Sequence, residues 1–195
     1  MFKRDIDTLY ENLLKKYDKE IDKLDKQENR KCSCCKGCSF CCHQLIIITD
    51  FEVELLKYTI SILFRKDREK LERKVREQCE ILKNNNLTPK TITPYVTEQE
   101  QVYIQNKFFN LNLECPFLKN NECSIHSRRQ ISCMTYRNYG NIEECKNTIN
   151  VSEAYTFNNI EIDLRKEIYE KTGIIPGGFN VLQFALLEIF EKGEY

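Results

Sequence analysis

The stretch Cys35-Lys36-Gly37-Cys38-Ser39-Phe40-Cys41-Cys42 decides what kind of fold this sequence can form. Three cysteines stand three residues apart, and a fourth follows the last of them directly. Two intervening residues let successive thiolates turn inward around one small centre, and Gly37 can adopt the positive φ that points backbone N–H groups toward sulfur. C-x2-C repeats bind tetrahedral zinc and iron–sulfur clusters. The stretch therefore predicts an irregular metal-binding loop.

A second group of cysteines stands more than seventy residues downstream. It comprises Cys115-Pro116-Phe117-Leu118, Cys123-Ser124-Ile125-His126 and Cys133. We expect this group to supply the second half of the site, as zinc modules close with two knuckles. Folding must then bring the two groups together in space.

The number of sulfur atoms bears on the number of metal positions. Cys41 and Cys42 can hardly both bind one tetrahedral ion, because adjacent side chains diverge. Four cysteines of the first group and three of the second make seven, and Cys145 would make eight. A four-coordinate centre needs fewer, so the hypothesis is one multinuclear cluster or two nearby centres. A single zinc ion with spectator thiols is the alternative.

Other residues near the two groups have more than one interpretation. Cys79 lies on an apolar helical stripe, which favours a small buried hydrophobic residue. Cys32 and Cys34 are alternative ligands or surface thiols. Arg128 and Arg129 either neutralise thiolate charge or lie exposed in a turn. Ligation, or hydrogen bonding to a ligand, stays open for Cys145, His43 and His126.

Composition limits the function classes. The chain has 195 residues, so one domain with an appendage is expected. Its 30 basic and 30 acidic residues cancel, which gives no electrostatic case for binding nucleic acid or an anionic membrane. Charges interrupt the N-terminus, no apolar run approaches the roughly 20 residues of a spanning helix, and a cytoplasmic protein is expected.

The cysteine count agrees with that compartment. Thiols stay reduced in the cytosol, so 11 cysteines indicate metal or redox chemistry there. A disulfide framework is the alternative, and the odd number of cysteines weighs against it.

Hydrophobic periodicity predicts a mainly α protein, a small helical domain around the cysteine-rich centre. Helices are expected over 3–29, 50–64, 65–83, 160–171 and 181–191. Thr49 and Glu52 form a capping box for the second helix, Asn84-Asn85-Asn86 ends the third, Gly173 stops the fourth and Asn180 caps the last.

Three segments and the domain limits complete this expectation. Residues 45–48 are a short strand or a helix entry, 88–97 should be extended, and 102–109 could be strand or helix. The chain divides into an amphipathic N-terminal helix (1–31), a cysteine-cluster domain (32–147) and a C-terminal helical extension packed on it (148–195).

The two cysteine groups together resemble those of the CxxCxxCC family over about residues 35–140. This family is described as zinc- or iron-chelating, and flagellin lysine N-methylases are related to it. The chain departs from the family pattern at His126, Gln130 and Met134, where Tyr, Pro and Arg are usual, so activity that depends on the missing basic pair is in doubt. The resemblance implies metal binding by Cys35, Cys38, Cys41, Cys42, Cys115, Cys123 and Cys133.

These observations favour a metal-binding protein that holds an iron–sulfur cluster or iron/zinc ions in a redox, sensing or metal-handling role. One alternative is a metal-dependent protein-modifying enzyme such as a lysine N-methylase-like transferase, although no Gly-rich nucleotide loop follows a strand. A zinc-stabilised interaction module is the other alternative. Metal ions are the only partner that the sequence indicates.

Overall fold

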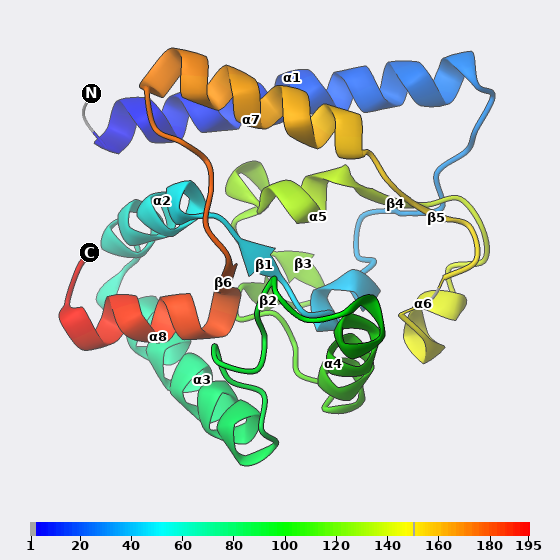
Figure 1. The fold of residues 1–195 in the computed structure, drawn as a ribbon. Helices are drawn as coiled ribbons and strands as arrows, with labels where there is room; N and C mark the ends of the chain where they lie inside the picture. The colour runs from blue at the N-terminus through cyan, green and yellow to red at the C-terminus, as the bar shows by residue number, and fades with distance from the viewer. Residues whose placement is uncertain (1–2, 150) are drawn as a thin grey trace. The chain divides into compact units, whose positions relative to one another are not determined.

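The computed structural model describes residues 3–149 and 151–195 and is mainly α, as the sequence predicts (Figure 1). The helices of the described residues are α1 (Lys3–Gln27), α2 (Asp50–Ser61), α3 (Arg65–Asn84), α4 (Glu98–Asn110), α5 (Ile131–Thr135), α6 (Glu144–Asn147), α7 (Asn158–Thr172) and α8 (Leu182–Lys192), with 3₁₀ turns η1 (Phe40–His43) and η2 (His126–Arg128). The strands are β1 (Ile47–Ile48), β2 (Leu118–Lys119), β3 (Glu122–Cys123), β4 (Tyr136–Asn138), β5 (Ala154–Thr156) and β6 (Asn180–Val181). None of the helices in these ranges has the length and apolar character needed to cross a membrane.

The chain forms two compact units, and each is built from two separate stretches of sequence. Unit 1 contains the chain up to Cys41 together with Leu118–Pro176. Unit 2 contains Cys42–Phe117 and Gly177–Tyr195. The cysteine-rich sequence 32–42 therefore contributes to both units.

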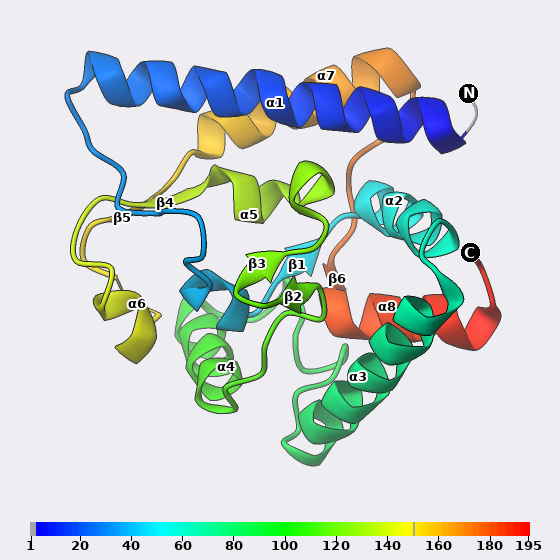
Figure 2. The ribbon, with the colours of Figure 1, turned by 180° about the vertical axis from the view of Figure 1, so that it is seen from behind.

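Unit 1 is built on the pairing of α1 with α7, which lie side by side in both views (Figures 1 and 2). The apolar stripe of α1 includes Leu14 and Ile21, and that of α7 includes Leu164 and Ile168; all four are fully buried. Two antiparallel strand pairs, the β2–β3 hairpin and β4–β5, complete the unit. Burial of these stripes explains why so highly charged a sequence forms stable helices here.

Unit 2 has a core between α3, α4 and α8. α3 packs along α8, while β1 pairs with β6 so that Ile47 lies opposite Val181. One buried cluster joins the end of α3 to α4 and β6 through Leu82, Leu87, Ile92, Ile104, Phe108 and Val181. This core supports α3, which contacts Cys115 in the same unit.

Several helix ends agree with the sequence prediction. The capping box is present: the Glu52 N–H donates to Thr49 Oγ1 at 3.2 Å, and the Thr49 N–H donates to Glu52 Oε2 at 2.8 Å. α3 ends at Asn84, and α7 ends where Gly173 takes a φ of 70°. Glycine adopts this left-handed conformation without a steric penalty.

Other expectations for the same unit were wrong or left undecided. Asn180 does not cap α8, because its Nδ2 donates to Asp50 Oδ1 at 2.7 Å and Val181 takes the capping position. Residues 88–97 form turns, closed where the Thr91 N–H donates to the Thr88 carbonyl at 2.9 Å, and are not extended. Residues 102–109 belong to α4, and residues 47–48 form β1.

The two capping boxes of unit 2 offer a matched stability test. Thr49 and Glu52 are buried, whereas the equivalent pair Thr97 and Glu100 at the start of α4 is exposed. We expect Thr49→Ala to lower the free energy of unfolding by about 1–2 kcal/mol and Thr97→Ala by about 0.5–1 kcal/mol. The larger loss arises because Glu52 would lose a donor inside the core. Urea unfolding of both variants measures the difference, and equal losses would contradict this explanation.

Candidate metal centre

Residues Cys35–Cys41 of the first cysteine group form a turn in unit 1. Gly37 has a φ of 86°, in the positive range that the sequence predicts, and the Cys38 N–H donates to the Cys35 carbonyl at 3.0 Å. The Phe40 N–H then donates to the Cys38 sulfur. All eleven cysteines lie within the described residues and carry thiols, not disulfides. The turn therefore presents sulfur together with backbone donors, as a metal knuckle requires.

The β2–β3 hairpin of the second group meets this turn. The Lys36 ammonium lies 3.4 Å from Glu122 Oε1, and Ser39 Oγ donates to Asn121 Oδ1 at 3.5 Å. The Ile125 N–H donates to the Cys123 sulfur, which repeats the arrangement at Cys38. Two cysteine segments far apart in sequence thus lie together in unit 1.

Cys41 stands among thiols from three segments of unit 1. Burial raises the pKa of four thiols, and the charge of Cys41 adds to the rise in each. The four are Cys34, whose pKa reaches about 12, Cys38, Cys123 and Cys145. A cation placed among these sulfur atoms would remove their mutual repulsion, so the donor set suits a thiophilic metal ion.

The remaining sequence-predicted cysteines lie in different places. Cys35 is exposed in the turn, and Cys133 is half-buried on α5; both belong to unit 1. Cys42 and Cys115 belong to unit 2, where the Cys115 N–H donates to the Cys42 carbonyl at 2.6 Å. On α3, Lys74 donates to the Cys115 carbonyl at 3.1 Å. Five of the seven cysteines are therefore in one unit and two in the other.

The thiols are not yet gathered into coordination geometry. Within residues 3–149 and 151–195, no three His, Cys, Asp or Glu side chains form a group that could hold a metal ion as they stand. Exposed contacts such as the ion pair of Lys36 with Glu122 join the Cys35–Cys41 turn to the β2–β3 hairpin. Contacts of this kind can rearrange. We therefore expect the turn to close when a metal ion is bound.

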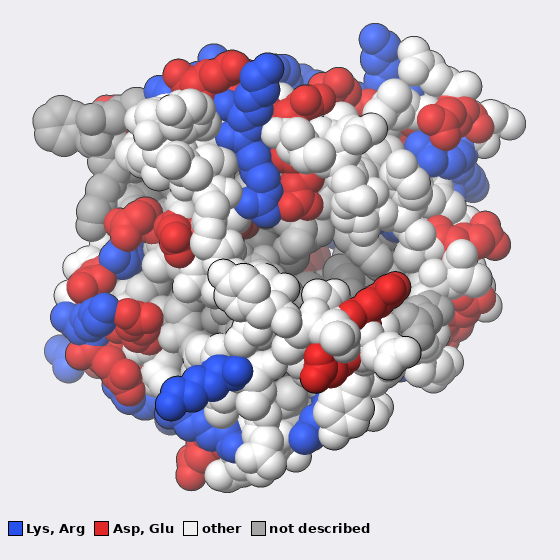
Figure 3. All heavy atoms as spheres, in the orientation of Figure 1, with Lys and Arg blue, Asp and Glu red and all other residues white. Residues whose placement is uncertain are grey.

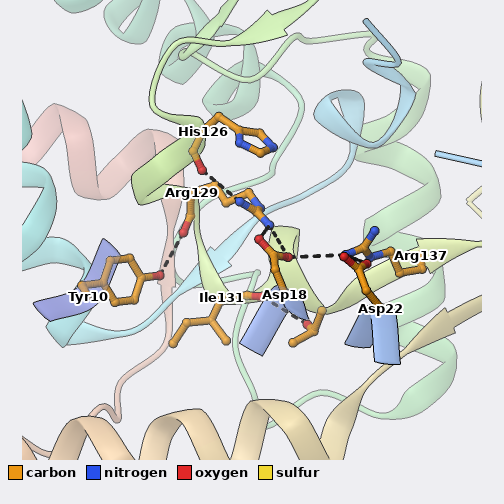
Figure 4. A network of polar contacts seen from close by, with 8 residues as sticks. Tyr10, Asp18, Asp22, His126, Arg129, Ile131 and Arg137 are labelled. Atoms are coloured by element: carbon orange, nitrogen blue, oxygen red, sulfur yellow. Dashed lines mark hydrogen bonds and ion pairs between the residues drawn. The ribbon is translucent and has the colours of Figure 1, made fainter. Parts of the chain in front are cut away.

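Arg128 and Arg129, which follow Cys123 in the sequence, pair with carboxylates of α1. Neither is a freely exposed turn residue. Arg128 Nε donates to Asp7 Oδ1 at 2.6 Å. Arg129 Nη2 donates to both carboxylate oxygens of Asp18 at 2.5–2.6 Å (Figure 4). The charge of Arg129 opposes the burial that raises the pKa of Cys123. Arg129 thus anchors the chain after Cys123 to α1, and it also offsets the charge of the Cys123 thiolate.

Arg137 is a site residue that sequence reasoning missed. It forms a hydrogen bond with the Cys32 thiol, and its Nη2 lies 3.4 Å from Asp18 and 3.6 Å from Asp22 (Figure 4). No spacing rule relates residue 137 to either cysteine group, because β4 carries it there. On the face in Figure 3, basic and acidic side chains are interspersed. The ion pairs of Arg137 with Asp18 and Asp22 are a local network of this kind.

The histidines show different surroundings. His43 Nδ1 is buried and has no hydrogen-bond partner among the described residues. Burial and the neighbouring Arg129 lower the pKa of His126, so this imidazole is held neutral. His126 therefore keeps a nitrogen lone pair at neutral pH, and both histidines stay candidates for ligation.

Cys79 is separate from these groups, as its apolar stripe predicts. It is 1% exposed, its thiol donates to the Gln183 carbonyl at 3.3 Å, and burial raises its pKa to about 12. A thiol with so high a pKa stays protonated, and only the thiolate is alkylated readily. We expect iodoacetamide at pH 8 to label exposed Cys35 at least tenfold faster than Cys79, as measured by peptide mass spectrometry. Equal labelling would contradict the burial of Cys79.

These features define a class of protein, a helical cysteine-cluster domain with thiols gathered from distant segments. The chain belongs to the CxxCxxCC family, described as "Putative zinc- or iron-chelating domain", whose family model matches residues 33–158. Comparison with curated proteins and with solved structures gives no match. The match confirms the resemblance seen in the sequence and extends it past Cys145 to the start of α7.

Proposed function

We propose that this chain is a metal-binding protein that holds an iron–sulfur cluster or iron/zinc ions in a redox, sensing or metal-handling role. The observation that supports it most is the meeting of the Cys35–Cys41 turn with the β2–β3 hairpin in unit 1. Thiolates are ligands for both zinc and iron. The proposed ligands are Cys35, Cys38, Cys41, Cys42, Cys115, Cys123 and Cys133.

The surrounding residues would prepare these ligands. Backbone N–H groups of Phe40 and Ile125 donate to the sulfur atoms of Cys38 and Cys123, which favours their thiolate forms. Arg129 places positive charge near Cys123, so the thiolates repel one another less. A bound metal would supply the remaining positive charge and, if it is iron, a centre that can exchange electrons.

The distribution of cysteines supports more than one metal position. Unit 1 contributes five of the proposed ligands, and unit 2 contributes Cys42 and Cys115. Adjacent side chains such as those of Cys41 and Cys42 diverge, which favours their binding at different positions. The proposal is therefore one multinuclear cluster or two centres, and a single zinc ion is the competing interpretation.

Anaerobic purification followed by metal and sulfide analysis tests the proposal. We expect bound iron or zinc in at least stoichiometric amount, and a visible charge-transfer spectrum with inorganic sulfide if the centre is an iron–sulfur cluster. One colourless zinc ion per chain would replace the multinuclear proposal with a zinc-stabilised module. Protein that binds neither metal after anaerobic loading would refute the proposed function.

A further inference from the structure

Asn138 on β4 holds two cysteines that lie outside the proposed ligand set. Its backbone N–H donates to the Cys34 sulfur at 3.4 Å, and its Nδ2 donates to the Cys145 sulfur at 3.3 Å. The residue is fully buried, and its own Oδ1 accepts the Gly140 N–H at 2.9 Å. The carbonyl of Asn138 accepts the Ser33 N–H at 2.8 Å, which fixes the chain beside Cys34. One residue therefore positions both sulfur atoms.

The direction of these hydrogen bonds distinguishes Cys34 and Cys145 from an ordinary buried thiol. Cys79 donates its S–H to a carbonyl, as a neutral thiol does. Cys34 and Cys145 instead accept N–H donors, as Cys38 and Cys123 do. N–H donors directed at sulfur are typical of cysteines that bind metal, and the exposed Cys34 is open to an incoming ion.

The positions of Cys34 and Cys145 also differ from that of Cys79. Cys145 is 5% exposed on α6 and lies within electrostatic reach of Cys38 and Cys41, and Cys34 lies within reach of Cys41. All four belong to unit 1, so the comparison involves one compact body. Both cysteines that Asn138 contacts thus lie near Cys41.

We propose that Cys34 and Cys145 are further ligands of the metal centre around Cys41, and that Asn138 is the residue that positions them. This inference rests on the proposed function, because it assigns ligands to the same centre. With Cys38 and Cys41, the pair makes four sulfur donors within unit 1, the number that a tetrahedral ion or a cubane cluster takes when the Cys35–Cys41 turn closes on it.

Cobalt(II) is the probe for the ligand assignment, because it replaces zinc and its absorption reports bound thiolates. Cys34→Ser and Cys145→Ser keep size and hydrogen-bonding capacity but remove sulfur. We expect each to lower the thiolate-to-cobalt charge-transfer absorbance per bound ion and to weaken cobalt binding by at least about tenfold. The control Cys79→Ser should leave both quantities unchanged. Circular dichroism checks that each variant folds.

Asn138→Asp tests the positioning role. Aspartate has the same shape and keeps the acceptor for Gly140, but it replaces the donor to Cys145 by a carboxylate oxygen. We expect cobalt affinity to fall by about 10–100-fold. The charge-transfer band should also move to lower energy, because a sulfur without a donor gives up its electrons more easily. A merely structural role would lower thermal stability without moving the band.

The outcomes separate this inference from the proposed function. If the wild-type chain binds no cobalt, zinc or iron, the proposed function fails and the inference fails with it. If the wild-type chain binds metal while the Cys34 and Cys145 variants keep its absorbance and affinity, only the inference is overturned. In that case the ligands are those of the two sequence motifs alone.

Discussion

Replacing Cys41 by serine should remove most of the metal from unit 1. Structural zinc sites of four ligands have apparent binding free energies of about 10–16 kcal/mol, so one ligand accounts for about 3 kcal/mol. That loss corresponds to a weakening of about a hundredfold. Cys41 should show the full effect, because its charge reaches four other thiols. Competition with a chromogenic chelator measures the affinity.

Cys79→Ser is the matched control for this measurement. It also removes one thiol, in this case a buried one on the α3 face that contacts Gln183 on α8. We expect metal affinity within twofold of the wild-type value. A Cys41→Ser protein that retains wild-type affinity would show that the metal is held elsewhere.

The second large effect should come from Asp18→Ala on α1. Asp18 accepts two hydrogen bonds from Arg129 and lies 3.4 Å from Arg137, and the Arg129 and Asp18 side chains are only 12% and 25% exposed (Figure 4). Removing one partner of a buried pair leaves an uncompensated charge, which costs 3–5 kcal/mol when burial is complete. Because solvent still reaches this pair, we expect a loss of about 2–3 kcal/mol in the free energy of unfolding.

Urea unfolding measures this loss, and Asp22→Ala is the control. Asp22 contacts the same Arg137 at 3.6 Å, but its side chain is 58% exposed. An exposed ion pair contributes little, so we expect a change below about 1 kcal/mol. Equal effects of the two substitutions would mean that the Arg129–Asp18 pair does not anchor the chain around Arg129 to α1.

The helices were predictable because periodic apolar residues and end signals agree along each of them. α1 and α3 combine buried stripes with charged faces, and the Asn84–Asn86 and Gly173 stops are local signals. α4 shows the limit of this reading. Its Thr97–Glu100 capping box repeats that of Thr49–Glu52 and could have identified the helix.

The short strands were not predictable in the same way. β1 and β6 are two residues each and are defined by pairing between Ile47 and Val181, which are distant in sequence. The sequence predicts Asn180 as the cap of α8, but its side chain donates a hydrogen bond to Asp50 instead. Tertiary contacts thus decided what local propensity left open.

Part of the candidate site was predictable from the sequence and part was not. The spacing of the cysteines predicts the Cys35–Cys41 turn and the second cysteine group, because spacing is a local property of the sequence. The roles of Asn138 and Arg137 depend on β4, whose pairing with β5 fixes which atoms face the cysteines. Hydrogen bonds such as Asn138 to Cys145 cannot be read from spacing.

X-ray absorption at the metal edge of the anaerobically loaded chain tests the central claim most directly. If cysteines hold the metal, the nearest scatterers are sulfur atoms at about 2.3 Å. A nearest shell made only of nitrogen and oxygen at about 2.0–2.2 Å would contradict the claim, since the cysteines would then not be the ligands.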